Sequence, residues 1–166
     1  MRFSQEFPEE SGPGRQACLQ LYRRLTAGVS VVTAHGPDGV TGMTASSVTS
    51  VSLAPPLLLV ALANGSRTLA AIRARRAFAV HLLRSDQQDL ASRFASPRRR
   101  HEAVPQHRTV LGTPVLSDVL AWSVCLVEAE HAHGDHTIVI GAVAAARAGS
   151  GRPLLWHDRA YAELAS

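Results

Sequence analysis

Short apolar and β-branched segments recur along the chain and predict a protein built mainly from β-strands. The segments 29–34 and 40–48 flank the turn sequence Gly36-Pro37-Asp38-Gly39 and predict a β-hairpin. The apolar run 57–63 is too short for a typical helix, which predicts a strand buried on both faces in the middle of the core.

The C-terminal half of the chain predicts a second, longer hairpin. The segments 119–133 and 137–146 are both strand-like, and the tight turn between them carries Gly134, Asp135 and His136. Two further strands are predicted over 77–83 and 153–157.

Three short helices are predicted. The segment 17–25 has apolar residues at three- and four-residue spacing, and 68–76 follows Ser66, a good N-cap. The third helix, 86–94, follows Ser85, which stands three residues before Gln88 as in a capping box.

These elements predict one domain of the mainly β class. Six or seven strands with a few short helices favour a small antiparallel barrel, because a Rossmann sheet would need strands and helices in regular alternation. Residues 1–14 are interrupted by Pro and Gly and predict a flexible arm, so the domain is expected over 15–166. The segment 98–113 is polar and irregular.

All basic side chains of the chain are arginine. Its 17 basic residues stand against 13 acidic ones, and it contains no lysine. Chemistry that needs a lysine amine is therefore excluded, whereas guanidinium groups suit phosphates and carboxylates. The positive charge gathers between Arg67 and Arg108, which favours attraction of polyanions. The run 98–101 lacks the interleaved aromatic residues of a nucleic-acid binder, so no nucleic-acid partner is expected.

The cysteine spacing and the N-terminal sequence indicate in which cellular compartment the protein is expected. Cys18 and Cys125 stand far apart and do not have zinc-like spacing, so neither a disulfide framework nor a zinc finger is expected. The acidic N-terminus does not resemble a signal peptide, and no apolar run approaches the roughly 18 residues of a membrane helix. The prediction is a cytoplasmic protein without membrane contact.

Two segments carry candidate chemistry. In residues 41–53, seven of thirteen are Ser or Thr; their hydroxyls suit a phosphate or the polar edge of a heterocycle, or else simply face water on an exposed strand. His136 follows Asp135 at the predicted turn, either as a titratable group or as a structural cap of the turn. A metal site shared with His131 and His133 is not expected, because the third histidine lies beyond the turn.

Several segments, in the same order, match one pattern: LTAGVSVVTA (25–34), DGVTGMTASSVTSVSLAPPLLLVAL (38–62), NGSRTLAAIRARRAFAVHLL (64–83), the pair 94–95, GDHTIVIGAV (134–143) and PLLWHDRAY (153–161). On these segments the chain resembles the short-chain flavin reductase family, the reductase components of two-component flavin-dependent monooxygenases. The resemblance implies a split β-barrel with Greek-key connections and short peripheral helices. It also implies a homodimer that binds flavin in a groove near the interface.

The resemblance implies the site residues as well. His136 takes the position near which the nicotinamide stacks on the flavin, and it is expected to orient the nicotinamide. The family often has Asn where this chain has Ser46 and His81, and His81 is expected to be structural. The implied flavin contacts are Gly28, Ser30, Thr44, Ala45, Ser46, Ser47, Ser50, Ser52, Leu53, Pro55, Pro56, Ser66, Arg67, Thr68, Phe94, Gly134 and Asp135.

The implied function is that of an NAD(P)H:flavin oxidoreductase. Hydride would pass from nicotinamide C4 to flavin N5, and the reduced flavin would leave to supply a separate monooxygenase. FAD is favoured over FMN because the basic segment offers extra arginines, and NADH is favoured over NADPH because no cluster for a 2′-phosphate is identified. The alternatives are a flavin-binding or sensor module that keeps its cofactor, and an oxidase of pyridoxine phosphate, which the segments fit poorly.

Overall fold

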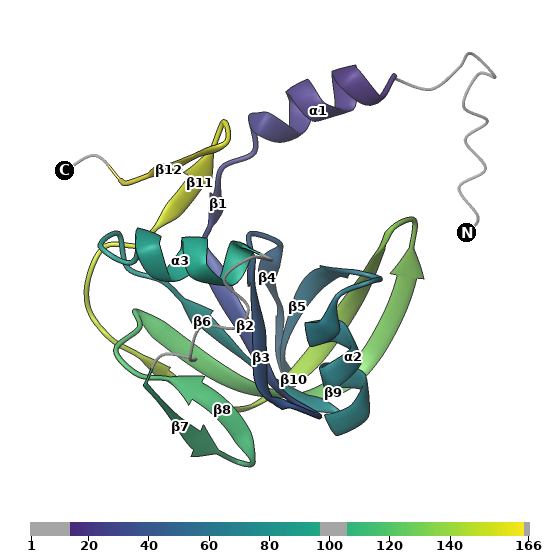
Figure 1. Ribbon diagram of the computed structural model, residues 1–166, viewed down its shortest axis with the longest axis vertical. Helices are drawn as coiled ribbons and strands as arrows, with labels where there is room; N and C mark the ends of the chain where they lie inside the picture. Colours follow the sequence, from purple (N-terminus) through teal and green to yellow (C-terminus); the bar gives the residue numbers. More distant parts are fainter. Residues whose placement is uncertain (1–13, 97–105, 165–166) are drawn as a thin grey trace.

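A seven-stranded antiparallel sheet dominates the computed structural model, which describes residues 14–96 and 106–164 (Figure 1). The strand order is β3-β2-β6-β9-β10-β5-β4. The two outermost strands, β3 and β4, follow one another in the chain with only two residues between them, so the sheet curls until its edges meet. Its strands are β2 (Ser30–Gly36), β3 (Gly39–Ala45), β4 (Val48–Leu53), β5 (Pro56–Ala63), β6 (Ala77–Leu82), β9 (Ala121–His133) and β10 (His136–Ala148).

Shorter elements lie around this barrel. The small sheet β1-β11-β12 lies at one end of the molecule together with α1, and the hairpin β7–β8 lies at the other (Figure 1). These elements are α1 (Arg15–Arg23), β1 (Ala27–Gly28), α2 (Arg67–Arg75), α3 (Gln88–Ala95), β7 (His107–Val110), β8 (Thr113–Leu116), β11 (Leu155–His157) and β12 (Ala160–Ala162).

The inside of the barrel is filled by apolar side chains and closed by α2. Leu69 and Ile72 of α2 are fully buried together with Phe78 of β6. Gly141 of β10 permits this packing, because a Cβ there would lie 2.7 Å from both Phe78 Cζ and Cys125 Cβ. Burial raises the pKa of the Cys125 thiol to about 11, so this residue behaves as a small hydrophobic side chain and not as a nucleophile.

Two further apolar clusters cover part of the outside of the sheet. Under α3 and the C-terminal strands, Val31, Leu83 and Leu154 are fully buried. The β7–β8 hairpin covers β6 and β9, where Val115 packs with Val124. These layers hold the barrel from outside and leave β4, β5 and the first half of β10 without such a cover among the described residues.

His81 joins three strands through its ring. It is fully buried, its Nδ1 lies 2.9 Å from the carbonyl oxygen of Val31, and the backbone N–H of Leu116 donates to its Nε2 at 3.0 Å. Because Nε2 accepts, the neutral ring carries its proton on Nδ1 and donates it to Val31. Burial lowers the pKa of His81 to about 4, so the ring is neutral at pH 7. The side chain is structural, as expected.

The predicted strands and helices are confirmed, with boundaries displaced by a few residues. The predicted strand 40–48 is in fact two strands, β3 and β4, with a corner at 46–47. The hairpin turn consists of Gly134 and Asp135, and His136 is already the first residue of β10, paired with His133.

Other predicted details are wrong. Ser85 does not cap α3: the helix begins at Gln88, and the Gln87 side chain accepts the backbone N–H of Arg84 at 2.9 Å. The segment 98–113 was expected to be irregular, yet β7 and the start of β8 lie in it, and β12 was not predicted. The predicted arm falls almost wholly on residues 1–13, which lie outside the described part of the chain, as do 97–105.

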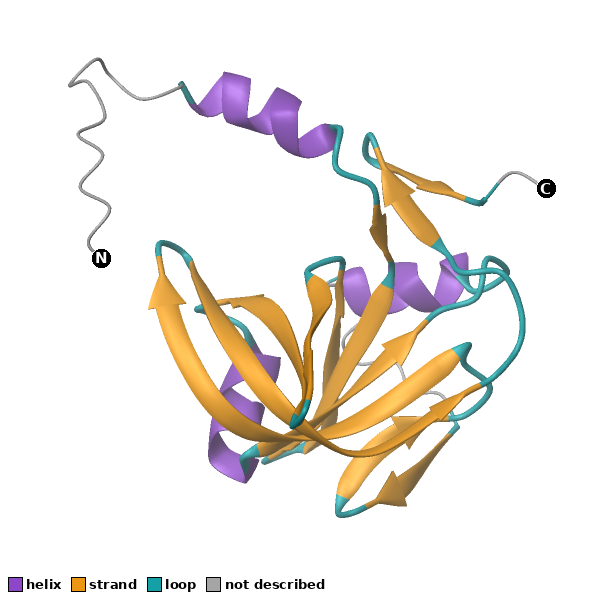
Figure 2. Ribbon diagram, turned by 180° about the vertical axis from the view of Figure 1, so that it is seen from behind, coloured by secondary structure: helices purple, strands orange, loops and turns teal. Residues whose placement is uncertain are grey.

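Two apolar surfaces remain open. Helix α1 stands apart from the barrel in both views and buries none of its residues (Figures 1 and 2). Leu21, Tyr22 and Leu25 are 62%, 60% and 63% exposed. Strand β5 buries only Val60 and Leu62, so burial on both faces is wrong for the single chain.

Candidate functional site

Three segments singled out in the sequence meet at one end of the barrel. His136 pairs with Ala63 at the end of β5, so the turn before β10 lies beside the loop that leads into α2. On the other side of β5, the Ser47 hydroxyl donates to the carbonyl of Ala61 at 2.7 Å. Neighbouring strands are about 4.8 Å apart, so residues 46–47, 64–68 and 134–136 form one surface, here called the barrel-end surface.

His136 and Asp135 form a pair on this surface. His136 Nδ1 lies 2.6 Å from Asp135 Oδ1, and the side chains are 49% and 95% exposed. A carboxylate only accepts, so the imidazole carries a proton on Nδ1 and offers Nε2 to a ligand. The hydrogen bond and charge of His136 lower the pKa of Asp135, which keeps its carboxylate ionised.

Helix α2 begins at the barrel-end surface. Ser66 is its N-cap, as predicted: its Oγ accepts the N–H of Leu69 at 3.1 Å and donates to Met43 Sδ at 3.2 Å. The first turn of a helix presents N–H groups and the positive end of the helix dipole, a combination that favours an anion.

The two residues after this cap differ in their exposure to solvent. Arg67 Nη2 donates to Asp38 Oδ2 at 3.2 Å, and both side chains are mostly exposed. This exposed ion pair is weak, so an anionic ligand can compete with Asp38 for the guanidinium. Thr68 is 2% exposed, so its side chain is not accessible to a ligand in this structure.

Much of the hydroxyl-rich segment serves the fold. Thr44 donates to a main-chain carbonyl of α3 at 2.6 Å, and Ser52 accepts a backbone N–H of the turn after β4 at 3.2 Å. Ser47 both donates to and accepts from the backbone of β5. Ser46 and Ser50 are exposed. Thr44, Ser47 and Ser52 therefore fit neither interpretation of this segment, because their hydroxyls bond to the backbone. The exposed hydroxyls of Ser46 and Ser50 are accessible to water or to a ligand.

Other predicted contacts lie away from the barrel-end surface. Leu53 pairs with Pro56 at the far end of β4 and is 93% exposed, and Pro55 lies between them. Strand β4 has six residues, so this end is about 17 Å from the corner at 46–47.

The remaining predicted residues belong to β1, β2, β3 and α3. Ser30 pairs with Ala45, both are buried, and the Ser30 hydroxyl has no hydrogen-bond partner among the described residues. Gly28 is exposed on β1. The Phe94 ring packs on Gly42, where a Cβ would lie 2.8 Å from its Cε1, so Phe94 belongs to the cluster under α3.

Asn64 is a site residue that was not predicted. Its backbone N–H donates to Asp135 O at 2.9 Å, and its Nδ2 donates to Gly134 O at 3.1 Å. The only signal in the sequence was its position at the start of the NGSR turn, because partners so distant in sequence become visible only once β5 and β10 are paired.

The basic segment is partly neutralised by acids from other parts of the chain. Arg73 and Arg76 both donate to Glu130, at 2.8 Å and 3.0 Å. Arg84 donates to Asp118 at 3.0 Å and lowers the pKa of that carboxyl. The attraction for dinucleotides is therefore weaker than the charge count of the segment predicts.

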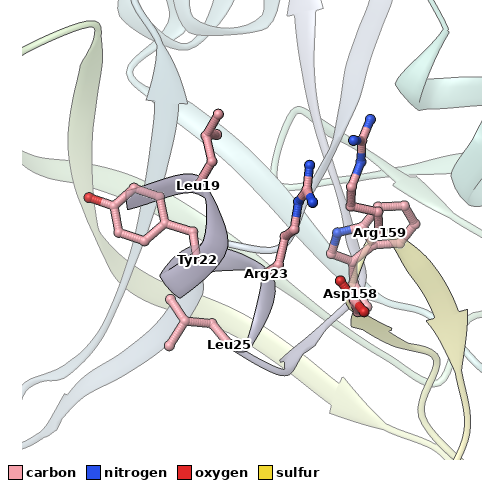
Figure 3. A pocket seen from close by; sticks show the side chains of 7 residues that line it. Leu19, Tyr22, Arg23, Leu25, Asp158 and Arg159 are labelled. Carbon is pink, nitrogen blue, oxygen red and sulfur yellow. The ribbon is translucent and has the colours of Figure 1, made fainter. Parts of the chain in front are cut away.

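A cavity of about 410 Å³ lies between α1 and the β11–β12 hairpin, away from the barrel-end surface. Figure 3 shows Tyr22 and Leu25 on one side of the helix, with Arg23 on the side of Asp158 and Arg159. This cavity depends on a helix that touches the rest of the described chain very little.

Neither a metal site nor a membrane-spanning helix is found in the described residues. No three His, Cys, Asp or Glu side chains are grouped as metal ligands in residues 14–96 and 106–164. In the same residues, no helix is long and apolar enough to cross a membrane.

Comparison with curated proteins finds close relatives. The flavin reductase (NADH) of Kitasatospora aureofaciens is 44% identical over 150 residues, which are 87% of this chain and 78% of that protein. The FMN reductase (NADH) SmoA of Agrobacterium fabrum is 39% identical over 137 residues, or 82% and 79% of the two chains.

Solved structures are similar over nearly the whole chain. The styrene monooxygenase flavin reductase of Pseudomonas putida S12 superposes with a TM-score of 0.82 and 30% identity, covering 89% of this chain and 97% of that one. The NADH:FAD oxidoreductase SgcE6 of Streptomyces globisporus C-1027, in complex with NAD and FAD fragments, gives 0.84 and 28%, covering 95% and 97%. The family model described as flavin reductase like domain matches residues 22–165, and the chain therefore belongs to the flavin reductase family.

Proposed function

We propose that this protein is an NADH-dependent flavin reductase that acts on a freely exchanging flavin. One observation carries the proposal: the barrel-end surface joins a helix N-terminus, the corner at 46–47 and the Asp135–His136 pair, although these lie far apart in the sequence. The names of the relatives, NADH-dependent reductases of flavin or FMN, support the same activity.

The donors on this surface fit a flavin nucleotide. Backbone N–H groups at the start of α2 and the guanidinium of Arg67 suit its phosphate. The exposed hydroxyl of Ser46 at the corner suits the polar edge of its ring. The nicotinamide supplies hydride at C4, the flavin accepts it at N5, and the protein has to hold the two rings together. His136 is the residue proposed to orient the nicotinamide through Nε2.

The test of this function is steady-state oxidation of NADH by the purified protein. NADH should be consumed only when free flavin is added, and bound flavin should be lost on dialysis. A protein that retains its flavin and does not oxidise NADH would instead be the flavin-binding module considered from the sequence.

FAD is proposed as the preferred flavin and NADH as the preferred nicotinamide. A similar structure holds fragments of NAD and FAD, whereas a similar curated protein is an FMN reductase. Initial rates with FAD, FMN and riboflavin, each with NADH and NADPH, decide the preference. A higher kcat/KM for FMN than for FAD would overturn the proposed choice.

A separate monooxygenase is proposed to receive the reduced flavin. The solved relative named after styrene monooxygenase supports this kind of partner. Reduced flavin that leaves the protein should drive a flavin-dependent monooxygenase across a dialysis membrane. Product formed only when the two proteins share one compartment would argue against free release.

A homodimer is proposed from the uncovered outer face of β5 and β10. Leu57 and Leu59 of β5 point outward with Ile138 and Ile140 of β10, all four are only partly buried, and none belongs to the described core clusters. In Figure 2 the β9–β10 hairpin crosses the molecule with no helix in front of it. An apolar, uncharged face of this kind is self-complementary, as a two-fold interface requires.

The proposed interface and the proposed site adjoin. Along β10, His136 has the same outward direction as Ile138, because side chains two apart share one face of a strand. A partner subunit seated on this face would therefore lie next to His136.

A further inference from the structure

Asn64 is the only asparagine of the chain, and it hydrogen-bonds to the turn before β10 and to Thr137 at the start of that strand. Its backbone N–H donates to Asp135 O at 2.9 Å and its Nδ2 donates to Gly134 O at 3.1 Å. Its Oδ1 accepts the hydroxyl of Thr137 at 2.8 Å. A side-chain amide is suited to this place because it donates and accepts at once.

These contacts enclose His136 on both sides. The carbonyl before it, that of Asp135, and the hydroxyl after it, that of Thr137, are both held by the same residue. The turn is exposed at the tip of a long hairpin, and Gly134 has a φ of +59°. Such tips open easily without tertiary contacts, so Asn64 restrains the backbone that carries the imidazole.

The same residue connects this turn to α2. Asn64 stands two residues before Ser66, the N-cap, and the backbone N–H of Ser66 donates to Ala63 O at 2.9 Å. The buried Thr137 hydroxyl also accepts from Arg73 Nη2 of α2 at 3.3 Å. The turn and the start of β10 are thus hydrogen-bonded to the segment before α2 through Asn64 and to the last turn of α2 through Arg73.

We propose that Asn64 is a positioning residue for flavin reduction. It fixes His136 relative to the first turn of α2, and so sets the spacing between the nicotinamide and the flavin phosphate. This inference rests on the proposed function. Loss of the Asn64 side-chain amide leaves the first turn of α2 and the turn before β10 in place. The imidazole of His136 can then move together with that turn.

The test compares Asn64→Ala with Asn64→Asp, which keeps the acceptor for Thr137 and loses the donor to Gly134. Both should raise KM for NADH, by about 10-fold for alanine, with a smaller change in KM for flavin. Thr137→Val should act in the same direction, and Thr137→Ser, which keeps the hydroxyl, should restore the KM of the wild type. Gln88→Ala, an exposed amide on α3, is the matched control.

A double-mutant cycle separates positioning from general destabilisation. If Asn64 acts through His136, Asn64→Ala should change KM for NADH by less than about 2-fold in the His136→Ala background. The Asn64→Ala variant should also show faster amide hydrogen exchange at residues 134–137, because the side-chain hydrogen bonds to this segment are lost.

Two results would overturn the inference alone: an active Asn64→Ala enzyme with unchanged KM for NADH, or fully additive effects with His136→Ala. A wild-type protein that oxidises no NADH with any flavin would remove the proposed function, and the inference with it.

Discussion

Individual side chains of this barrel are specified by their hydrogen-bonding capacity and volume. His81 uses both ring nitrogens to join β6 to two other strands, and Gly141 leaves room for the side chains of Phe78 and Cys125. Each requirement predicts a measurable cost when the residue is changed.

The stability that His81 contributes to the fold depends on pH. The pKa of His81 is lowered from 6.5 to about 4 in the folded protein, so as pH falls the unfolded chain takes up the proton first. The contribution of neutral His81 to the free energy of unfolding is complete above pH 6.5 and is lost as pH falls toward 4. The total loss is about 3 kcal/mol.

His81→Asn keeps a donor and an acceptor but does not titrate. The free energy of unfolding, measured by urea titration between pH 4.5 and 8, should decline less steeply with acid in this variant than in the wild type. Parallel pH profiles for the two proteins would contradict the assignment.

The requirement at Gly141 is steric. Gly141→Ala should destabilise the fold by about 1–3 kcal/mol, because the new Cβ would lie 2.7 Å from two buried atoms. Gly65→Ala, where a Cβ would meet nothing within 4 Å, is the control and should change the melting temperature little. Equal melting temperatures for both variants would refute the packing argument.

At the scale of elements, local signals predicted well what local interactions determine. The turn sequence 36–39, the N-cap Ser66 and the hairpin around Gly134 all act within a few residues, and each is found where expected. The capping box predicted at Ser85 is not formed, because the helix begins at Gln88 and the backbone N–H of Ser85 donates instead to Arg152 O at 2.9 Å.

What could not be predicted depends on distant partners. Residue types do not reveal that Thr44 would donate to α3 or that Asn64 would hold the turn before β10, since both pairings require the finished sheet. The assembly of the barrel-end surface was expected through a family resemblance, and its hydrogen bonds became known only from the structure.

The cap of α2 gives a prediction at this scale. Ser66→Ala should lower the free energy of unfolding by about 1 kcal/mol, because the N–H of Leu69 loses its acceptor. Ser66→Asn, another good cap residue, should recover most of that loss in the same denaturant titration. A variant with alanine as stable as the wild type would show that the cap contributes nothing.

At the scale of the whole molecule, residues 14–96 and 106–164 leave apolar surface that none of their own elements covers. The outer face of β5 and β10 and the apolar side of α1 are both open. Helix α1 buries none of its nine residues, and a helix of this length is marginal in water without tertiary packing.

The proposed dimer is tested by mass in solution. Light scattering after size exclusion should give about twice 17.7 kDa for the wild type. Leu59→Arg should shift the protein toward the monomer, because a guanidinium would then be buried without a partner at the interface. Leu111→Arg, on the exposed turn of β7–β8, should leave the mass unchanged. A monomeric wild type would end the proposal.

The two edge strands of the barrel, β3 and β4, have a further consequence. Strands β3 and β4 each pair with one neighbour only, so each carries a row of backbone groups that the described ladders do not use. Such edges attract strands of other molecules and favour aggregation. The bulge between Ser50 and Ser52, and Pro55 and Pro56 after β4, interrupt that edge at intervals. The β4 edge therefore offers other proteins no long, regular strand to extend, although it has only one partner strand in the sheet.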